Sequence, residues 1–121
     1  MPLEIASGAT THRFTVEVAR TREEQATGLM HRQSLAPDRG MVFPFANPRI
    51  ASFWMKDTLI PLDIIFIRAD GSITNIENAV PLSLEPVVSY EDVTAVLEIP
   101  GGRAAELGIK PGDTVKWSIP K

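Results

Sequence analysis

The segment "IFIRADGSITNI" at residues 65–76 carries the strongest structural signal in the chain. Two runs of β-branched and apolar residues flank Asp70 and Gly71, and a glycine adopts a positive φ angle without a Cβ clash. This pattern is typical of a β-hairpin with a tight turn. We therefore predict paired strands at residues 64–68 and 72–77.

Short segments rich in β-branched and aromatic residues recur on both sides of this hairpin. In residues 12–19, Phe14, Val16 and Val18 alternate with polar neighbours, which predicts a strand with one buried face. Further strands are predicted at residues 40–45, 50–56, 63–68, 72–80, 94–99 and 113–119. Ten prolines punctuate these segments and limit their length. The expected fold is mainly β (α+β), a small and mostly antiparallel barrel or bent sandwich.

Two short helices are predicted between the strands. The first lies at residues 21–30, where Thr21 and Glu24 have the spacing of a capping box. Its apolar side chains recur on one face, which we expect to plug the barrel. The second lies at residues 101–108 and ends before Pro111, which forbids its continuation.

Length and composition fit a single globular domain that spans residues 1–121. Of the 121 residues, 44% are hydrophobic and 22% are charged, and a core of this size needs neither disulfides nor metal for stability. The chain has no cysteine, which excludes thiol nucleophiles, disulfides and sulfur-ligated zinc.

Charge and hydropathy argue against two classes of partner. The net charge is -3, from 12 basic and 15 acidic side chains that are interspersed, so no basic stripe is present for a nucleic acid backbone. The apolar run at residues 62–67 is interrupted by Asp63 and is far shorter than the roughly 20 residues that cross a bilayer. We expect no nucleic acid partner and no transmembrane segment. Residues 1–14 lack the basic start and apolar middle of a secretory leader.

Several motifs, in order along the chain, closely resemble the family known as domain of unknown function 192. They are "GLMHR" (28–32), "GMVFPF" (40–45), "FWMKDT" (53–58), "PLDIIFI" (61–67) and "LEIPGG" (97–102), within a family-like core of about residues 14–117. Ordered motifs at consistent spacing are more specific than a single short pattern. The chain departs from the family at Asp57, where Asn is common, and at Gly101, where Ala is frequent.

The resemblance implies a small, mostly β domain with short helices. It implies no particular activity, because the family is named for lacking one. Many proteobacterial members look like exported proteins with an amino-terminal leader. The resemblance therefore implies a periplasmic or otherwise exported protein whose leader is absent from this sequence, and the alternative is a cytoplasmic protein.

A polar site is predicted beside Trp54 and Lys56. If residues 52–57 form a strand, alternation places these two side chains together on the face opposite to Met55. Thr58 then lies near the following turn. An aromatic ring beside a cation and a hydroxyl group can bind an anionic or sugar-like ligand. The alternative is that Trp54 packs against another element, Lys56 covers it and the next two residues merely form a turn.

Asp63 and Glu98 are carboxylates within strand segments that are otherwise apolar. Asp63 is predicted to point to the apolar side of its strand, where a charge needs a partner. Arg32, Lys56 or backbone amides near Thr58 could supply this partner, which would make Asp63 a structural clamp. Glu98 needs a cation if it faces the barrel interior. The functional alternative is that Asp63 and Glu98 act as a general acid and base.

No metal or cofactor site is predicted. Met30, Met41 and Met55 lie among apolar neighbours, which favours core packing over a copper site. The histidines, His12 and His31, have no acid or serine at the spacing of a catalytic triad.

These observations lead to several functional hypotheses. The leading one is a non-catalytic, exported binding or accessory domain for a small anionic or sugar-like ligand or for a protein partner. A second is a hydrolase or lyase in which Asp63 or Glu98 performs acid–base chemistry. A third is peptide binding by strand addition, because "AAELGIKPGDTV" at residues 104–115 resembles the closing helix, turn and strand of PDZ domains. A purely structural role of the motifs is the remaining alternative. The residues predicted for the site are Arg32, Trp54, Lys56, Asp57, Thr58, Asp63 and Glu98.

Overall fold

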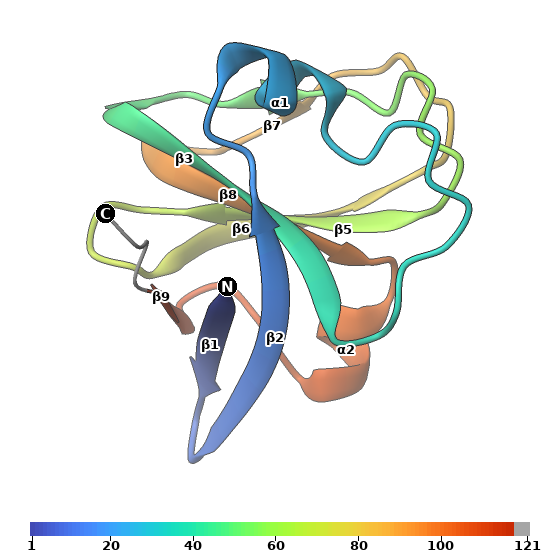
Figure 1. Cartoon of the computed structure of the whole chain (residues 1–121). Helices are drawn as coiled ribbons and strands as arrows, with labels where there is room; N and C mark the ends of the chain where they lie inside the picture. Colours follow the sequence, from blue (N-terminus) through green and yellow to red (C-terminus); the bar gives the residue numbers. More distant parts are fainter. Residues whose placement is uncertain (118–121) are drawn as a thin grey trace.

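Seven strands form one continuous sheet that curls into a barrel (Figure 1). The structure is a computed structural model and describes residues 1–117 of the chain. The order across the sheet is β6 (Ile73–Ala79), β5 (Leu62–Ile67), β8 (Val93–Pro100), β3 (Arg39–Arg49), β2 (Thr10–Val18), β1 (Pro2–Ser7) and β9 (Thr114–Trp117). Neighbouring strands are antiparallel except for β2 and β3, which are parallel. The prediction of a mainly β, mostly antiparallel domain with two short helices is confirmed.

The first and last strands of this order meet and draw the sheet into a barrel. Ser72, just before β6, forms an antiparallel bridge with Thr114 of β9. The amide of Ile73 donates to the carbonyl of Asp113 at 2.8 Å, and the amide of Val115 donates to the carbonyl of Gly71 at 2.8 Å. The Asp70-Gly71 turn therefore joins β5 to β6 and also holds β9 in place.

The predicted hairpin at this turn is present with slightly shifted boundaries. Strands β5 and β6 pair in antiparallel register, with Ile65 opposite Ile76. Gly71 has a φ angle of +90°, which only glycine adopts readily. The amide of Ser72 donates to the side chain of Asp70 at 2.9 Å, which fixes the turn.

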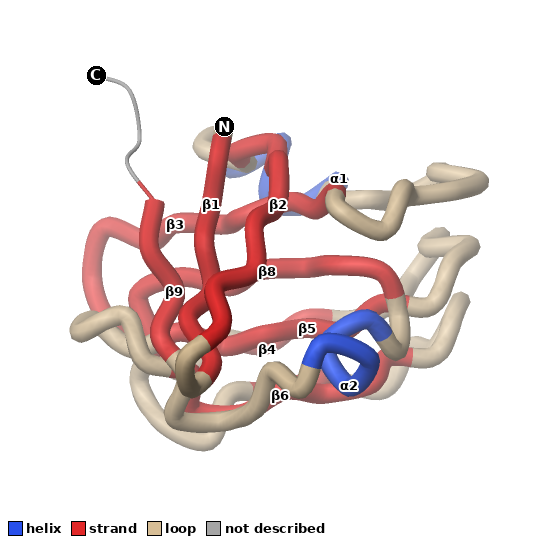
Figure 2. The backbone as a smooth tube through the Cα atoms, turned by 90° about the horizontal axis from the view of Figure 1, so that it is seen from below, coloured by secondary structure: helices blue, strands red, loops and turns tan. Residues whose placement is uncertain are grey.

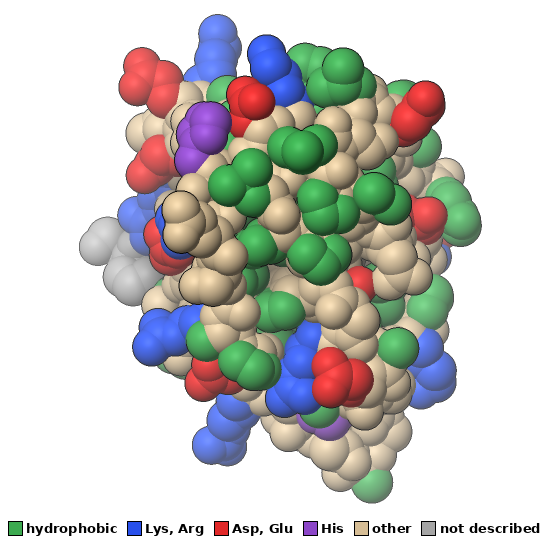
Figure 3. Space-filling model, turned by 90° about the vertical axis from the view of Figure 1, so that its right-hand side faces the viewer, with side chains coloured by type: hydrophobic (Ala, Val, Ile, Leu, Met, Phe, Trp, Pro, Cys, Tyr) green, Lys and Arg blue, Asp and Glu red, His purple; other side chains and the backbone are tan. Residues whose placement is uncertain are grey.

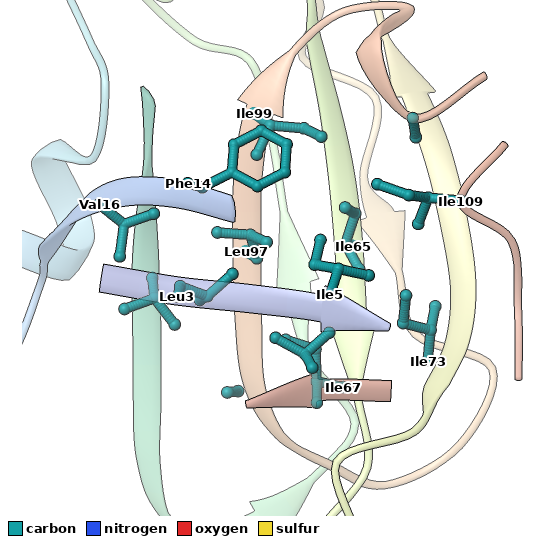
Figure 4. Packing of buried hydrophobic residues seen from close by; sticks show 14 residues of the cluster. Leu3, Ile5, Phe14, Val16, Ile65, Ile67, Ile73, Leu97, Ile99 and Ile109 are labelled. Atoms are coloured by element: carbon teal, nitrogen blue, oxygen red, sulfur yellow. The ribbon is translucent and has the colours of Figure 1, made fainter. Parts of the chain in front are cut away.

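Strand β5 is buried on both faces and separates two hydrophobic cores. Ile65 and Ile67 point into the barrel, where they meet the other residues of the interior core (Figure 4). Ile64 and Phe66 point outward into a second core between the barrel and an outer layer. This double burial explains why β5 is an almost continuous apolar run, since neither face contacts water.

The outer layer consists of helix α1 (Arg22–Thr27) and a two-stranded sheet of β4 (Ser52–Phe53) and β7 (Val87–Val88). Helix α1 begins with the predicted capping box, in which Thr21 and Glu24 bond each other's backbone amides. The prediction that this helix plugs the barrel is wrong. None of its residues is buried, and it ends at Gly28, before Leu29 enters the outer core.

Helix α2 (Arg103–Leu107) closes the barrel instead. It lies at the lower right of the barrel in Figure 1 and faces the viewer in Figure 2. Ala104 and the following Ile109 belong to the interior core. Gly108 ends the helix in a left-handed conformation, as the sequence predicted. No helix within residues 1–117 is long and apolar enough to span a bilayer.

Asp63 of β5 clamps helix α2 to the sheet. Its buried carboxylate accepts hydrogen bonds from the amide of Gly102 at 3.0 Å, the amide of Ala104 at 2.9 Å and the side chain of Asn78 at 2.7 Å. It therefore satisfies amides of the first turn of α2, which have no partner within the helix. The predicted partners were Arg32, Lys56 or amides near Thr58. The observed amide donors come instead from the start of α2, about 40 residues after Asp63 in the sequence, because this helix packs against the end of the barrel where Asp63 lies.

This clamp predicts that Asp63→Ala destabilises the fold without affecting its surface. The substitution leaves buried donors unpartnered, and we expect the free energy of unfolding to fall by about 3 kcal/mol. Urea unfolding followed by tryptophan fluorescence measures this change. Asp38→Ala removes an exposed carboxylate that makes no side-chain hydrogen bond within residues 1–117, and it should change stability by less than about 0.5 kcal/mol. Equal stability of the two variants would contradict the clamp.

Candidate functional site

A cavity of about 440 Å³ lies in the outer layer, above the face of the sheet that is opposite to the barrel interior. Helix α1 and the residues after it form one wall, and the end of β3 with β4 forms another. Its lining includes the rings of Phe43, Phe45, Phe53 and Trp54 and the polar side chains of Gln25, Arg49, Ser52, Thr58 and Glu98. Aromatic walls with a few polar groups are typical of small-molecule sites.

Glu98 contributes a carboxyl group to this cavity. It lies on β8, where Leu97 and Ile99 point into the barrel, so strand alternation directs Glu98 to the outer face. The residue is 4% exposed and makes no hydrogen bond or ion pair with any residue in the described range 1–117. Sequence reasoning considered an interior position for Glu98, and this is wrong. Burial raises its pKa to about 8, so the group is mostly protonated at neutral pH.

Gly28 lies beside the carboxyl group of Glu98, and its lack of a side chain leaves space there within the cavity. Its backbone has φ 49° and ψ -128°, a conformation that is accessible essentially to glycine alone. A Cβ atom at this position would lie 3.4 Å from the ring of Phe43 and 3.9 Å from Oε1 of Glu98. A larger residue would therefore narrow the space beside the carboxyl group.

Trp54 and Lys56 lie together, as the sequence predicted, although the strand is shorter than expected. Strand β4 ends at Phe53, while Met55 remains buried in the outer core. Trp54 is 49% exposed at the edge of the cavity. Nζ of Lys56 lies 5.4 Å from the centroid of the Trp54 ring, a cation–π geometry. Lys56 itself does not line the cavity.

Asp57 and Thr58 form the turn that ends this segment. Asp57 has a positive φ angle of 55°, and its carbonyl accepts a hydrogen bond from the amide of His31 at 2.8 Å. The amide of Thr58 donates to the carbonyl of Met55 at 3.1 Å. The turn carries Thr58 into the cavity lining and leaves the Asp57 side chain exposed.

The predicted grouping of all the site residues around one hollow is wrong. Trp54, Thr58 and Glu98 share the cavity, and Lys56 stacks against Trp54. Arg32 lies elsewhere and forms a two-point ion pair with Glu17, at 2.7 and 2.9 Å. This hydrogen bonding lowers the pKa of Glu17.

The predicted acid–base pair of Asp63 and Glu98 is also wrong in its geometry. In the pairing of β5 with β8, Asp63 lies opposite Ile99 and Ile64 lies opposite Glu98. The two carboxyl groups therefore lie on opposite faces of the sheet, and the three hydrogen bonds of Asp63 engage both of its oxygens. Within residues 1–117, no group of three or more His, Asp or Glu side chains could hold a metal ion.

Sequence reasoning missed Gln25, Arg49 and the phenylalanines of the cavity wall. Alternation in residues 40–45 could have placed Phe43 and Phe45 on one face, because they are two residues apart in a predicted strand. Nε2 of Gln25 donates to the carbonyl of Pro44 at 2.8 Å, which ties α1 to β3. The guanidinium carbon of Arg49 lies 4.0 Å from the centroid of the Phe45 ring.

Large apolar side chains are exposed on the two adjacent segments 54–59 and 80–86. The amide of Met55 donates to the carbonyl of Ser83, and the amide of Leu82 donates to the carbonyl of Thr58, so residues 80–86 lie beside residues 54–59. The exposed apolar side chains of these two segments are Trp54, Leu59, Val80, Leu82 and Leu84. Seen from the right-hand side of Figure 1, apolar side chains gather on one face of the molecule (Figure 3).

Known proteins resemble the chain over nearly its whole length. The model of the family DUF192, described as "Uncharacterized ACR", matches residues 3–117. A crystal structure of a protein of unknown function from Novosphingobium aromaticivorans DSM 12444 is 48% identical with a TM-score of 0.94, covering 97% of this chain and 84% of that chain. A protein from Sinorhizobium meliloti 1021, described as a candidate transcription regulator, is 42% identical with a TM-score of 0.92, covering 95% and 91%. No curated protein matches the chain.

The raised pKa of Glu98 predicts a pH-dependent stability that Glu98→Gln removes. Above the ordinary value of 4.5 the unfolded chain releases the proton, whereas the folded chain keeps it until about pH 8. Between these values the wild type should lose stability relative to Glu98→Gln by about 1.4 kcal/mol per pH unit, with no further relative loss above pH 8. Urea unfolding of both proteins at several pH values measures the difference. Parallel stability curves would show that the pKa of Glu98 is ordinary.

Proposed function

The chain belongs to the DUF192 family, as its motifs predicted, and we propose that it is a non-catalytic domain that binds a small ligand in the cavity above Glu98. The single observation that carries this proposal is the carboxyl group of Glu98, which is buried, has no protein partner in residues 1–117 and faces a cavity large enough for a small molecule. Export of the domain is part of the proposal and rests on the resemblance to exported family members.

The unpartnered carboxyl group supports binding because buried polar groups are nearly always hydrogen-bonded. A core position on β8 would otherwise favour an apolar residue, as at Val96, its neighbour on the same face. A protonated carboxyl group donates one hydrogen bond and accepts others, which matches a hydroxyl or amide group of a ligand. The Glu98 side chain is thus suited to recognise an uncharged polar group.

The aromatic walls support a ligand with a flat or ring-shaped body. Phe43 and Phe53 contact each other edge to face, with centroids 5.0 Å apart, and form a rigid apolar surface. Trp54 exposes about half of its surface at the edge of the cavity, where a sugar ring or an aromatic ring could pack against it. Sugar-like compounds combine such a face with hydroxyl groups.

Binding is favoured over hydrolysis because, among residues 1–117, the cavity lining contains one carboxyl group and no second acid or base that could share a proton with it. Asp63, the other half of the predicted pair, holds helix α2 on the opposite face. The strand-addition alternative also loses support, since α2 packs Ala104 into the barrel end. The description of the Sinorhizobium meliloti relative suggests DNA binding, but a net charge of -3 does not favour it.

The proposal predicts that neutral hydroxyl compounds bind more tightly to the wild type than to Glu98→Leu. Glucose, glycerol and phenol are titrated separately into ¹⁵N-labelled protein, and amide shifts are followed by NMR. We expect saturable shifts at Gly28, Ser52 and Trp54 with at least one probe, and affinity at least about tenfold lower in Glu98→Leu, because the variant lacks the hydrogen-bonding group.

Two controls accompany this titration. Glu98→Leu should be at least as stable as the wild type, since it removes an unpartnered buried polar group, so lost binding would not reflect unfolding. Glu106→Leu alters an exposed glutamate of α2, at the barrel end, and should bind like the wild type. Equal binding by Glu98→Leu, or shifts that cluster away from the cavity, would refute the proposal.

A further inference from the structure

A second hollow, of about 500 Å³, adjoins the Glu98 cavity at the end of β3. The two hollows share Gln25, Phe45 and Arg49 in their linings. The second hollow is lined in addition by Arg20, which precedes α1, and by Arg22, the first residue of α1, and no acidic side chain within residues 1–117 lines it. Its lining therefore carries three positive charges on a chain whose net charge is -3.

The charges around this hollow are unevenly balanced. Glu23 and Glu24 are the acidic residues in the first turn of α1, and Glu24 bonds to the segment before the helix. The carboxylate of Glu24 accepts hydrogen bonds from the amides of Arg20 and Thr21, and its charge partly offsets that of Arg20. Arg22 and Arg49 form no ion pair with any residue between 1 and 117. The guanidinium of Arg49 is instead held over the ring of Phe45, 4.0 Å from its centroid, at the boundary between the two hollows.

We infer that the ligand of the proposed site carries an oxyanion, which Arg49 and Arg22 bind, while its uncharged body lies in the Glu98 cavity. This inference rests on the proposed function and names the chemical class of its ligand. A carboxylate and a phosphate share the relevant chemistry, because guanidinium groups present paired N–H donors to either one. Arg49 is the central residue, since it borders both hollows.

The state of Glu98 agrees with this ligand class. Because burial raises its pKa to about 8, the carboxyl group is mostly uncharged at neutral pH and does not repel an anion nearby. A cationic ligand is disfavoured because the positive charge of Arg49, at the wall of the same cavity, would repel it. The expected ligand is therefore a small acid with a hydroxyl-bearing or aromatic body.

The test compares charged and neutral probes in the full chain. Inorganic phosphate, glucose 6-phosphate, benzoate and glucose are titrated at constant ionic strength and followed by ¹⁵N NMR. We expect the three anions to shift the amides of Arg22, Phe45 and Arg49 in a saturable manner, and glucose 6-phosphate to bind at least tenfold more tightly than glucose. The relative affinities of the phosphate probes and benzoate distinguish phosphate from carboxylate ligands.

Matched variants separate this site from general attraction of anions. Arg49→Gln and Arg22→Gln should each weaken binding of the anions at least fivefold, whereas Arg13→Gln, which removes an exposed arginine on β2, should not. All three positions are exposed, so the variants should keep the wild-type spectrum elsewhere.

The outcomes distinguish failure of this inference from failure of the proposed function. If glucose or phenol binds at Gly28 and Trp54 but the anions bind equally well to Arg49→Gln and to the wild type, the inference is refuted and the cavity remains a binding site. If none of the neutral or anionic probes produces saturable shifts, both are refuted. Equal loss of binding in Arg13→Gln and Arg49→Gln would show nonspecific attraction and would also overturn the inference.

Discussion

The burial of β5 on both faces is the constraint on which the rest of the structure depends. All six residues of Leu62–Ile67 are at most 1% exposed, so the strand must be covered from the barrel interior and from outside. The interior core is closed by helix α2, and the outer core is covered by β4, β7 and the residues on either side of α1. Removing either cover would expose a face of large aliphatic and aromatic side chains to water.

Asp63 and Glu98 lie on opposite faces of this sheet, and their carboxyl groups therefore have different surroundings. Asp63 points inward at the end of the barrel and accepts hydrogen bonds from amides at the start of α2. Its carboxylate therefore stabilises the fold. Glu98, one strand away, points outward between Met41 and Ile64, where its side chain makes no hydrogen bond with any residue in the range 1–117. Close pairing of β3 with β8 holds Glu98 there, and it requires Gly40, because a Cβ atom at residue 40 would lie 2.4 Å from the carbonyl oxygen of Glu98.

The barrel and the outer layer contribute different parts of the cavity. The strands of the barrel fix the position of Glu98, while the walls and rim of the cavity come mainly from α1, the short β4 and the adjoining turns. Segments of this kind can change without disturbing the barrel core, and binding residues are often placed on them. The cations beside the cavity likewise come from the end of β3, the start of α1 and the residue before its N-cap.

The sequence by itself determined the local features: the Asp70-Gly71 hairpin, the capping box at Thr21, the end of α2 at Gly108 and the mainly β class. Each depends on residues a few positions apart, whose backbone preferences act in any context. It also indicated that Trp54 and Lys56 are neighbours and that Asp63 and Glu98 are unusual. Only the tertiary structure decided which face of the sheet each carboxyl group occupies, that α2 closes the barrel, and that Arg49 borders the Glu98 cavity. These depend on the order in which distant strands pair, and alternation along one strand cannot specify which core lies on which side.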